Sequence, residues 1–331
     1  MVILAVNFNE TVILPSIYHP LGALPARFRR ERVLIVGCGD VGMRVARLLQ
    51  GKTRVMALTS TAGRVGLLRA EGLVPLRGNL DQPATLRRLA GLATRILHLA
   101  PPPGEGKIDP RTLALVRALR LRDGPRSAVY GSTSGVYGDC QGRWVDETCA
   151  LHPETPRAWR RVDAESQWRL FGRATGARSG ILRIPGIYAP DREGGTPRGR
   201  LLKSIPVLRS EDDVYTNHIH ADDLARACLL ALWRCAAQRV YNTNDDTELQ
   251  MGDYVDLAAD LYDLPRPPRI ARNDASARLP PILLSFMQES RRMVNSRLKN
   301  ELGLQLRYPT VRQGLDTHAV TVSKPTSSST E

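Results

Sequence analysis

Three glycines near the start of the chain have the spacing of a loop that binds phosphate groups. They form the pattern G-x-G-x-x-G, in which the first glycine permits a tight turn, the second lets a pyrophosphate approach the backbone, and the third lets a helix pack closely. We therefore expect this loop to hold the pyrophosphate of a dinucleotide; the alternative is a glycine-rich turn without a ligand. The candidate residues are Gly37, Cys38, Gly39, Asp40, Val41 and Gly42.

The residues on either side of this loop predict the two elements that must position it. VLIVG, at 33–37, is a continuous apolar run, as expected of a parallel strand that is buried on both faces. MRVARLLQ, at 43–50, has the pattern of an amphipathic helix and is followed by Gly51. Such a unit of strand, loop and helix directs free N–H groups and the positive end of a helix dipole at the phosphates.

A second strand, predicted at 54–58, carries the residues that should meet the adenosine ribose. In the NAD form of such a site an Asp or Glu about 20 residues past the glycines binds the ribose hydroxyls. This chain has hydroxyl side chains there instead, Thr59 and Ser60, with Arg64 shortly after. Hydroxyls and a cation suit a 2′-phosphate, so we expect NADP in preference to NAD. The alternative for Arg64 is a solvated arginine at a helix start.

Further strands and helices alternate along the first half of the chain. Apolar runs follow near 73–77, 95–100 and 127–133, each leading into a loop. This alternation predicts an α/β fold with a doubly wound parallel sheet, in which ligands bind at the carboxyl ends of the strands. The loops at those ends add five candidate cofactor-binding residues: Asn79, Leu80, Ala100, Pro101 and Pro102.

Several separate blocks, in the right order, resemble the extended short-chain dehydrogenase/reductase superfamily and its NAD(P)-dependent epimerase/dehydratase group. STSGVYGD at 132–139 is similar to the S-[ST]-x-x-V-Y-G loop of that group, and LRIPGIYAP at 182–190 to its next strand and turn. TNHIHADDLARACLLAL at 216–232 resembles its I-H-x-D-D-x-A segment. The blocks at 239–261 and 292–315 resemble its C-terminal layout. One departure is the tighter glycine pattern, since extended members usually carry G-x-x-G-x-x-G.

The resemblance implies an oxidoreductase or isomerase that acts on a carbonyl or hydroxyl compound, such as a nucleotide-linked sugar. It places Thr133 where the group has its catalytic Ser or Thr. It also implies a smaller C-terminal substrate region that is interleaved with the cofactor domain and forms a lid. We expect the N-terminal extension at 1–30, the cofactor domain at 31–175, the substrate region at 176–316, and a disordered tail at 317–331.

The Tyr-x-x-x-Lys pair on which the chemistry of the group depends is missing. At the corresponding positions this chain has Arg157 and Arg161, and no shift of the alignment recovers the pair. Arginine keeps its proton at neutral pH, so neither residue can act as a general acid or base. Arg161 could still donate to ribose hydroxyls, and Arg157 could clamp a carboxylate or phosphate.

Proton transfer would then fall to Thr133 with a bound water, or to Tyr137. The alternatives are that Thr133 is a turn hydroxyl that bonds the backbone, and that Tyr137 packs and bonds its hydroxyl locally. A second function is equally open. A dinucleotide-binding sensor or regulatory protein without turnover is expected to lose both members of the pair and to keep the phosphate loop, as this chain does.

Other polar residues have simpler interpretations. His98 lies in a predicted strand and is expected to be a buried, hydrogen-bonded histidine. His218 and His220 share one strand face, and Asp222 with Asp223 is expected to cap the helix that follows, so we predict no metal site. Asp146 and Glu147 follow the V-Y-G loop. They match a position of the group at which an acidic residue precedes the substrate pocket; the alternative is that they are solvated loop acids.

Composition excludes some classes of protein. The chain of 331 residues has 47 Lys and Arg against 33 Asp and Glu, a net charge of +14. The arginines are scattered and accompany no nucleic-acid-binding signature, so we predict no nucleic-acid partner. No apolar run approaches the length of a membrane span. Five cysteines without a pairing pattern suggest reduced thiols in the cytoplasm.

The helix that contains Trp159 and Trp168 is of the kind through which the superfamily often dimerises, so a homodimer is expected; the alternative is that these side chains belong to the core.

Overall fold

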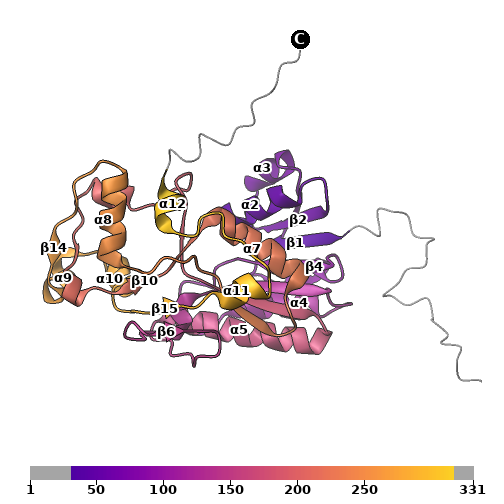
Figure 1. Cartoon of the computed structure of the whole chain (residues 1–331). Helices are drawn as coiled ribbons and strands as arrows, with labels where there is room; N and C mark the ends of the chain where they lie inside the picture. The colour runs from indigo at the N-terminus through magenta and orange to yellow at the C-terminus, as the bar shows by residue number, and fades with distance from the viewer. Residues whose placement is uncertain (1–30, 317–331) are drawn as a thin grey trace, which may run out of the picture.

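The fold is organised around a parallel sheet of seven strands, in the order β12-β7-β5-β4-β1-β2-β3. The computed structural model describes residues 31–316, so the expectations for 1–30 and 317–331 lie outside the described residues. The sheet confirms the predicted α/β Rossmann-type fold (Figure 1). Its strands are β1 (Arg32–Val36), β2 (Arg54–Thr59), β3 (Val74–Arg77), β4 (Arg95–His98), β5 (Ser127–Thr133), β7 (Arg178–Ile184) and β12 (Arg239–Asn242).

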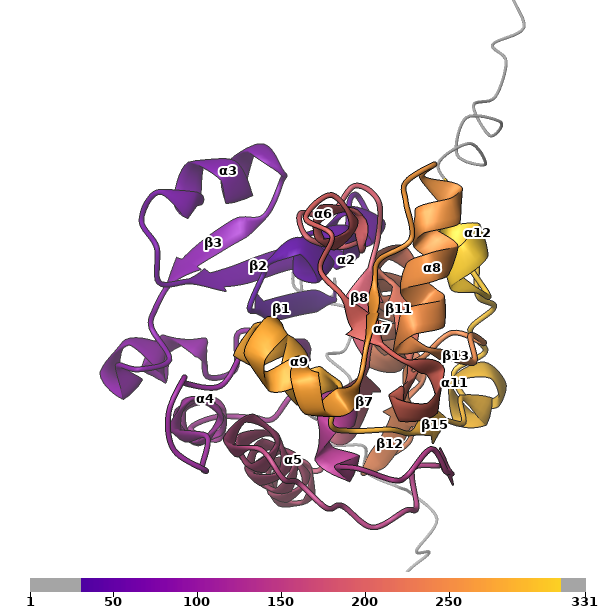
Figure 2. The same cartoon turned by 90° about the vertical axis from the view of Figure 1, so that its left-hand side faces the viewer.

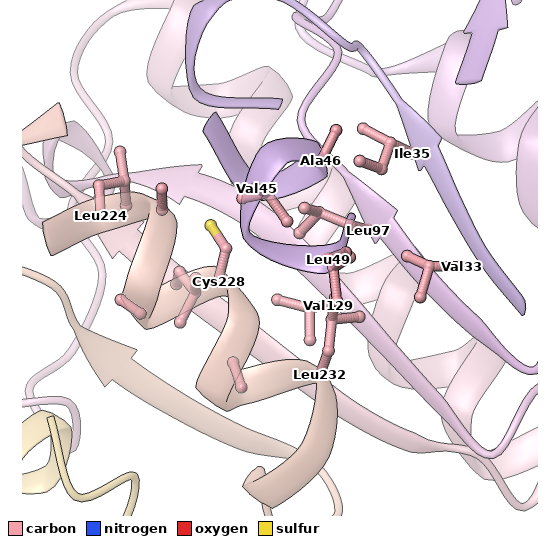
Figure 3. Close-up of a cluster of buried hydrophobic side chains, with 14 of the residues drawn as sticks. Val33, Ile35, Val45, Ala46, Leu49, Leu97, Val129, Leu224, Cys228 and Leu232 are labelled. Atoms are coloured by element: carbon pink, nitrogen blue, oxygen red, sulfur yellow. The ribbon is translucent and has the colours of Figure 1, made fainter. Parts of the chain in front are cut away.

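Alternate residues of the central strand β1 enter two different hydrophobic clusters. Val33 and Ile35 face one cluster, whereas Leu34 and Val36 face the other. Figure 3 shows the first cluster between the sheet and the helices α2 and α7. This double burial explains why the strand sequence is apolar throughout. The helices of the first face are α2 (Asp40–Leu49), α3 (Arg64–Ala70) and α7 (Ala221–Arg234); η1 (Pro83–Leu89), α4 (Pro110–Leu119) and α5 (Pro156–Thr175) lie on the second.

The C-terminal half both completes the sheet and forms a separate body beside it. Strands β7 and β12 and helix α7 all follow residue 175, so the expected boundary there runs through the sheet itself. Helices α8 (Met251–Leu261) and α12 (Val311–Leu315) pack together around their own hydrophobic cluster, away from the sheet (Figure 2). The remaining short elements are η2 (Ser134–Tyr137), β6 (Trp144–Val145), β8 (Gly186–Tyr188), α6 (Arg198–Leu201), β9 (Val207–Leu208), η3 (Ser210–Asp212), β10 (Tyr215–Thr216), β11 (His218–His220), β13 (Leu249–Gln250), β14 (Arg269–Ile270), α9 (Arg272–Arg278), α10 (Pro281–Phe286), β15 (Arg292–Met293) and α11 (Ser296–Asn300).

The start of α7 differs from the prediction that two acids cap it. The capping side chain is His220, whose Nδ1 accepts a hydrogen bond from the N–H of Asp222. Asp222 instead binds Arg44 on α2, and Asp223 accepts bonds from the backbone of Arg307 and of its neighbour. The acids thus join distant parts of the chain, which local spacing cannot reveal. Within the described residues no group of His, Cys, Asp and Glu could hold a metal ion.

His98 and most of the cysteines lie in the interior. His98 is buried, and its Nε2 lies 3.0 Å from Thr112 Oγ1; burial lowers the pKa of its imidazole to about 3, which confirms the expected structural role. All five cysteines are free thiols, and four of them are buried. Across residues 31–316, no helix has the length and apolar content that a membrane crossing needs.

A buried ion pair ties α5 to the sheet. The Arg183 guanidinium on β7 donates to both carboxylate oxygens of Glu165 on α5, at 3.2 and 2.9 Å. The side chains are only 3% and 2% exposed. Arg183 also donates to the Tyr137 hydroxyl at 2.9 Å, so the pair reaches into the V-Y-G loop. Two desolvated charges are tolerated here because each is held by several hydrogen bonds.

We expect Glu165→Gln to lower the free energy of unfolding by about 3–5 kcal/mol, because it leaves a buried cation unpaired. Urea denaturation measures the loss. Glu301→Gln is the matched control, since that carboxylate pairs with Arg239 in a partly exposed position, and should cost less than about 1 kcal/mol. Equal losses in the two variants would contradict this account of the buried pair.

Candidate functional site

A cavity of about 390 Å³ opens at the carboxyl ends of β1, β2 and β4. Most of the predicted cofactor-binding residues line it: Gly37, Cys38, Gly39, Thr59, Ser60, Arg64, Asn79, Leu80, Ala100 and Pro101. The other candidates, Asp40, Val41, Gly42 and Pro102, lie beside this lining in the chain but are not part of it. The structure thus brings together loops that are as much as 60 residues apart in sequence, as the parallel-sheet argument required.

The geometry gives a different reason for glycine at each of the three motif positions. Gly37 has a φ of +88°, and a Cβ there would lie 2.2 Å from the backbone nitrogen of Ala100. A Cβ on Gly42 would lie 3.1 Å from the carbonyl oxygen of Gly37, so this glycine lets α2 approach the turn. A Cβ on Gly39 would meet nothing within 4 Å. The space beside Gly39 is therefore open to a ligand rather than filled by protein.

Helix α2 begins directly after Gly39 and points its N-terminus at this cavity. No side chain caps the helix, so N–H groups of its first turn are available to an anion. The Asp40 side chain turns to two arginines, with Arg44 at 3.1 Å and Arg192 at 3.4 Å. Cys38 contributes backbone to the lining, while its buried thiol contacts Met43 and has a pKa raised by burial to about 11. The loop therefore offers N–H donors and no reactive thiolate.

The end of the cavity beside β2 carries hydroxyls and one arginine. Arg64 extends from α3 across this end and donates to the carbonyl oxygen of Cys38 at 2.7 Å. Thr59 is buried, and its Oγ1 accepts a hydrogen bond from the N–H of Thr61. Ser60 is exposed next to it. The guanidinium thus lies at the junction of the glycine loop and β2, and no carboxylate side chain stands at the end of this strand.

Sequence reasoning missed one arginine of the lining. Arg111, on α4, binds both oxygens of Asp81 at 2.7 Å and donates to the carbonyl oxygens of Pro101 and Pro102 at 3.3 Å. It therefore ties the loop after β3 to the loop after β4. No local pattern marks Arg111, because its partners lie in two other loops; only the predicted crevice between those loops could have pointed to it.

The loop after β5 places Thr133 at the next strand end along the sheet. Its Oγ1 accepts a hydrogen bond from the N–H of Gly135 at 3.3 Å, which is the turn role given as the alternative above. The side chain is nevertheless only partly buried. Among residues 31–316 nothing accepts the proton of this hydroxyl, so Thr133 keeps a donor for a ligand.

Tyr137 is not placed to act in the cleft. Its side chain is fully buried, and its hydroxyl donates to Asn242 Oδ1 at 2.7 Å while it accepts from Arg183. Burial raises the pKa of this phenol to about 12. The predicted proton-transfer role is therefore wrong, and the packed, locally bonded tyrosine is what the structure contains. Its partners come from β7 and β12, which the sequence near Tyr137 does not reveal.

The two arginines that replace the Tyr/Lys pair have different surroundings. Arg161 is 9% exposed and donates from one nitrogen to the Tyr130 hydroxyl at 2.9 Å and to the Gly131 carbonyl at 2.8 Å. Arg157, one turn earlier on α5, is exposed. Its charged neighbours are the cations of Arg161 and Arg160 and the carboxylate of Glu289. Arg161 thus binds side-chain and backbone groups of β5, whereas Arg157 is an exposed cation at the start of α5.

The two acids after the V-Y-G loop have local and structural partners. Asp146 Oδ1 accepts hydrogen bonds from the N–H and the hydroxyl of Thr148, at 2.8 and 2.6 Å, so it forms a loop turn. Glu147 accepts from the N–H of Asn242 at 2.8 Å and pairs with Arg297 at 3.4 Å. Burial raises the pKa of Glu147. Neither carboxylate lines the cofactor cavity.

Comparison with known proteins identifies the group to which this architecture belongs. The sequence model of the NAD dependent epimerase/dehydratase family matches residues 33–243, well over half of the chain. The chain belongs to this family. A "Putative UDP-glucose 4-epimerase" of Methanocaldococcus jannaschii is 23% identical over 178 residues, which are 49% of this chain and 57% of that protein. The match therefore spans little more than half the length of that relative.

Solved structures of similar proteins cover nearly the whole fold. A functionally unknown conserved protein from Silicibacter pomeroyi is 31% identical, with a TM-score of 0.74 over 88% of this chain and 99% of that one. UDP-glucose 4-epimerase from Thermotoga maritima is 18% identical, with a TM-score of 0.70 over 86% and 96%. At that identity the second likeness establishes the fold alone.

The residues of this epimerase/dehydratase-family protein fit a nicotinamide dinucleotide, the cofactor class of the family. The open space at Gly39, the uncapped N-terminus of α2 and the guanidinium of Arg64 would hold its phosphates. When bound, such a group accepts or supplies a hydride.

We expect Gly39→Ala to leave the free energy of unfolding within about 1 kcal/mol of the parent, because the added methyl meets open space. Its affinity for the dinucleotide should fall by about tenfold or more, because the methyl occupies the approach of the pyrophosphate. Fluorescence titration and thermal unfolding measure the two effects. Gly37→Ala is the contrasting variant: its methyl meets the backbone of Ala100, so it should lose stability by more than about 2 kcal/mol. The same stability in both variants would contradict this assignment.

Proposed function

We propose that the chain is an NADP(H)-binding, atypical oxidoreductase or isomerase that acts on a carbonyl or hydroxyl compound, with nucleotide-linked sugars as the substrate class. The observation that carries the proposal is the cavity at the strand ends, lined by the glycine loop and crossed at one end by Arg64. An open phosphate cradle beside a half-buried hydroxyl, Thr133, is an arrangement for bringing a dinucleotide to a substrate.

The preference for NADP rests on the groups at the end of β2. A ribose with free hydroxyls would be held by a carboxylate, and this place has Thr59, Ser60 and Arg64 instead. The Arg64 guanidinium uses one nitrogen for the Cys38 carbonyl and remains only partly buried, so it has further donors for a 2′-phosphate. The relatives solved with a dinucleotide include UDP-glucuronic acid 4-epimerase from Bacillus cereus, whose structure contains NAD. The proposal therefore gives this chain a different cofactor preference from that of the relative.

The substrate class is supported by what similar proteins bind. The Thermotoga maritima structure contains UDP-glucose. In this chain Thr133 would donate a hydrogen bond to the reacting oxygen of such a compound. Arg157 would pair with an anionic group of the substrate, because it is exposed and, among the residues that the structure describes, forms no ion pair shorter than 4 Å.

We expect NADPH to bind more tightly than NADH, and Arg64→Gln to weaken NADPH binding by about ten- to hundredfold through the loss of a charge-assisted contact. The affinity for NADH should change by less than about threefold. Calorimetric titration of both cofactors measures this. The matched control is Arg69→Gln, an exposed arginine on the same helix, α3, which should alter neither affinity. Tighter binding of NADH by the parent protein would reject the NADP assignment.

A second candidate function is a dinucleotide-binding sensor or regulatory protein without turnover. The observation that favours it is the burial of the Tyr137 hydroxyl together with arginine at both positions of the Tyr/Lys pair. Such a protein needs the phosphate cradle and can dispense with an acid or base.

The two functions differ in whether bound NADPH is consumed. An oxidoreductase should oxidise NADPH when it is offered a panel of carbonyl compounds that includes nucleotide-linked keto-sugars. The loss of absorbance of the reduced nicotinamide measures this oxidation. Thr133→Val should lower that rate by about ten- to a thousandfold, because it removes the hydroxyl and keeps the shape. Tight NADPH binding without oxidation across the panel would favour the sensor.

A further inference from the structure

A short segment between α10 and β15 is fixed against the loop that carries Thr133. Its Ser290 carbonyl accepts a hydrogen bond from the N–H of Cys140 at 3.0 Å, and its N–H donates to Asp139 Oδ1 at 2.8 Å. Arg291 adds a bond of 2.7 Å from its guanidinium to the Gly138 carbonyl. This connection joins residues about 150 positions apart in the chain. Whatever side chains the segment carries are therefore held at the end of β5.

One of those side chains is the carboxylate of Glu289. A Cβ on Gly135 would lie 3.7 Å from Glu289 Oε2 and 3.8 Å from Thr133 Oγ1, so the two oxygens lie around the same point of the loop. The side chain is 10% exposed, and Oε2 accepts a hydrogen bond of 2.8 Å from Arg291. The carboxylate and the hydroxyl thus both lie near Gly135, on the loop after β5.

Glu289 is paired with Arg291 of its own segment, whereas two other carboxylates of this region hold separate elements together. Glu165 is bound by Arg183 and Arg169, and Glu147 holds the backbone of β12. Glu289 faces the exposed cation of Arg157 across the loop. The Arg157 guanidinium, at a position where the family pattern has its tyrosine, is thus in the electrostatic neighbourhood of the Glu289 carboxylate.

The nicotinamide end of a dinucleotide in this cavity would be directed toward the loop of Thr133. The cavity places the adenosine end at β2 and the pyrophosphate at the start of α2. Its opposite wall is the loop after β4, and β5 is the next strand of the sheet beyond β4. A dinucleotide laid along the strand ends in this direction therefore brings its reactive ring to the loop of Thr133.

We propose that Glu289 is the proton-transferring group of this site, in place of the missing tyrosine; the inference rests on the proposed oxidoreductase function. In oxidation of a secondary alcohol, the C–H and O–H bonds break and the C=O double bond forms. The hydride passes to the oxidised nicotinamide, and the proton passes to the Glu289 carboxylate and then to solvent. Reduction reverses both transfers. Thr133 donates to the same substrate oxygen, and Arg157 binds a charged part of the substrate.

The position of Glu289 can be tested by cofactor binding without any substrate. Its carboxylate attracts the positive ring of NADP⁺ and has no such interaction with NADPH. Glu289→Gln should therefore raise the ratio of the dissociation constants, NADP⁺ over NADPH, by about three- to tenfold. Glu289→Asp should keep most of the parent ratio, and Glu211→Gln, an exposed glutamate on η3, should keep all of it. Calorimetric titration gives both constants, and thermal unfolding checks that each variant is folded.

The outcomes separate the two proposals. If both cofactors bind and Glu289→Gln leaves the ratio unchanged, Glu289 is not the proton-transferring group, while the proposed NADP(H)-binding function stands. If neither cofactor binds to the folded parent protein, both proposals are overturned. A raised ratio in Glu289→Gln, with the parent ratio in Glu211→Gln, supports the inference.

Discussion

The buried network around Arg183 is the constraint on which the rest of the structure depends. Its guanidinium holds the Glu165 carboxylate of α5 and the Tyr137 hydroxyl of the V-Y-G loop. Tyr137 in turn donates to Asn242 at the end of β12, and the Asn242 amide donates to the backbone of Val145 and of the strand β15 region. Helix, loop, sheet edge and C-terminal segment are therefore held by one set of hydrogen bonds. Removing a member leaves buried polar groups unpaired, which costs more than the bond itself.

This network explains why the tyrosine of the loop is not available for chemistry. A phenol that is buried and bonded to an amide and a guanidinium is kept protonated, and Tyr137 is not among the residues that line the cavity at the strand ends. The same holds in part for Arg161, which braces β5 through the Tyr130 hydroxyl and the Gly131 carbonyl. Arg161 and Arg183 are thus fixed by structure, whereas the Thr133 hydroxyl is half-buried and the Arg157 side chain is exposed.

The high arginine content has several uses within the fold. Arg64 crosses one end of the cavity, Arg111 joins two of its loops, and Arg44 links α2 to acids of the C-terminal half. The guanidinium groups of Arg111 and Arg44 each bind several oxygens from separate segments, which an ammonium group does less well. These arginines act as internal connections, and the net charge of +14 is a poor guide to partners.

The sequence alone determined what depends on short-range spacing. The apolar run of β1 directly precedes the glycine pattern, and the hydroxyls at the end of β2 follow about 20 residues later, as the dinucleotide-binding pattern requires. Their types and order were therefore enough to predict a phosphate-binding loop on a parallel sheet. The tertiary structure decided what depends on partners far along the chain. Tyr137 is turned inward by residues of β7 and β12, His220 replaces the predicted acidic cap, and Glu289 reaches Thr133 from about 150 residues away. A side chain's chemistry follows from its burial and its neighbours, and for these residues the neighbours come together only when the chain is folded.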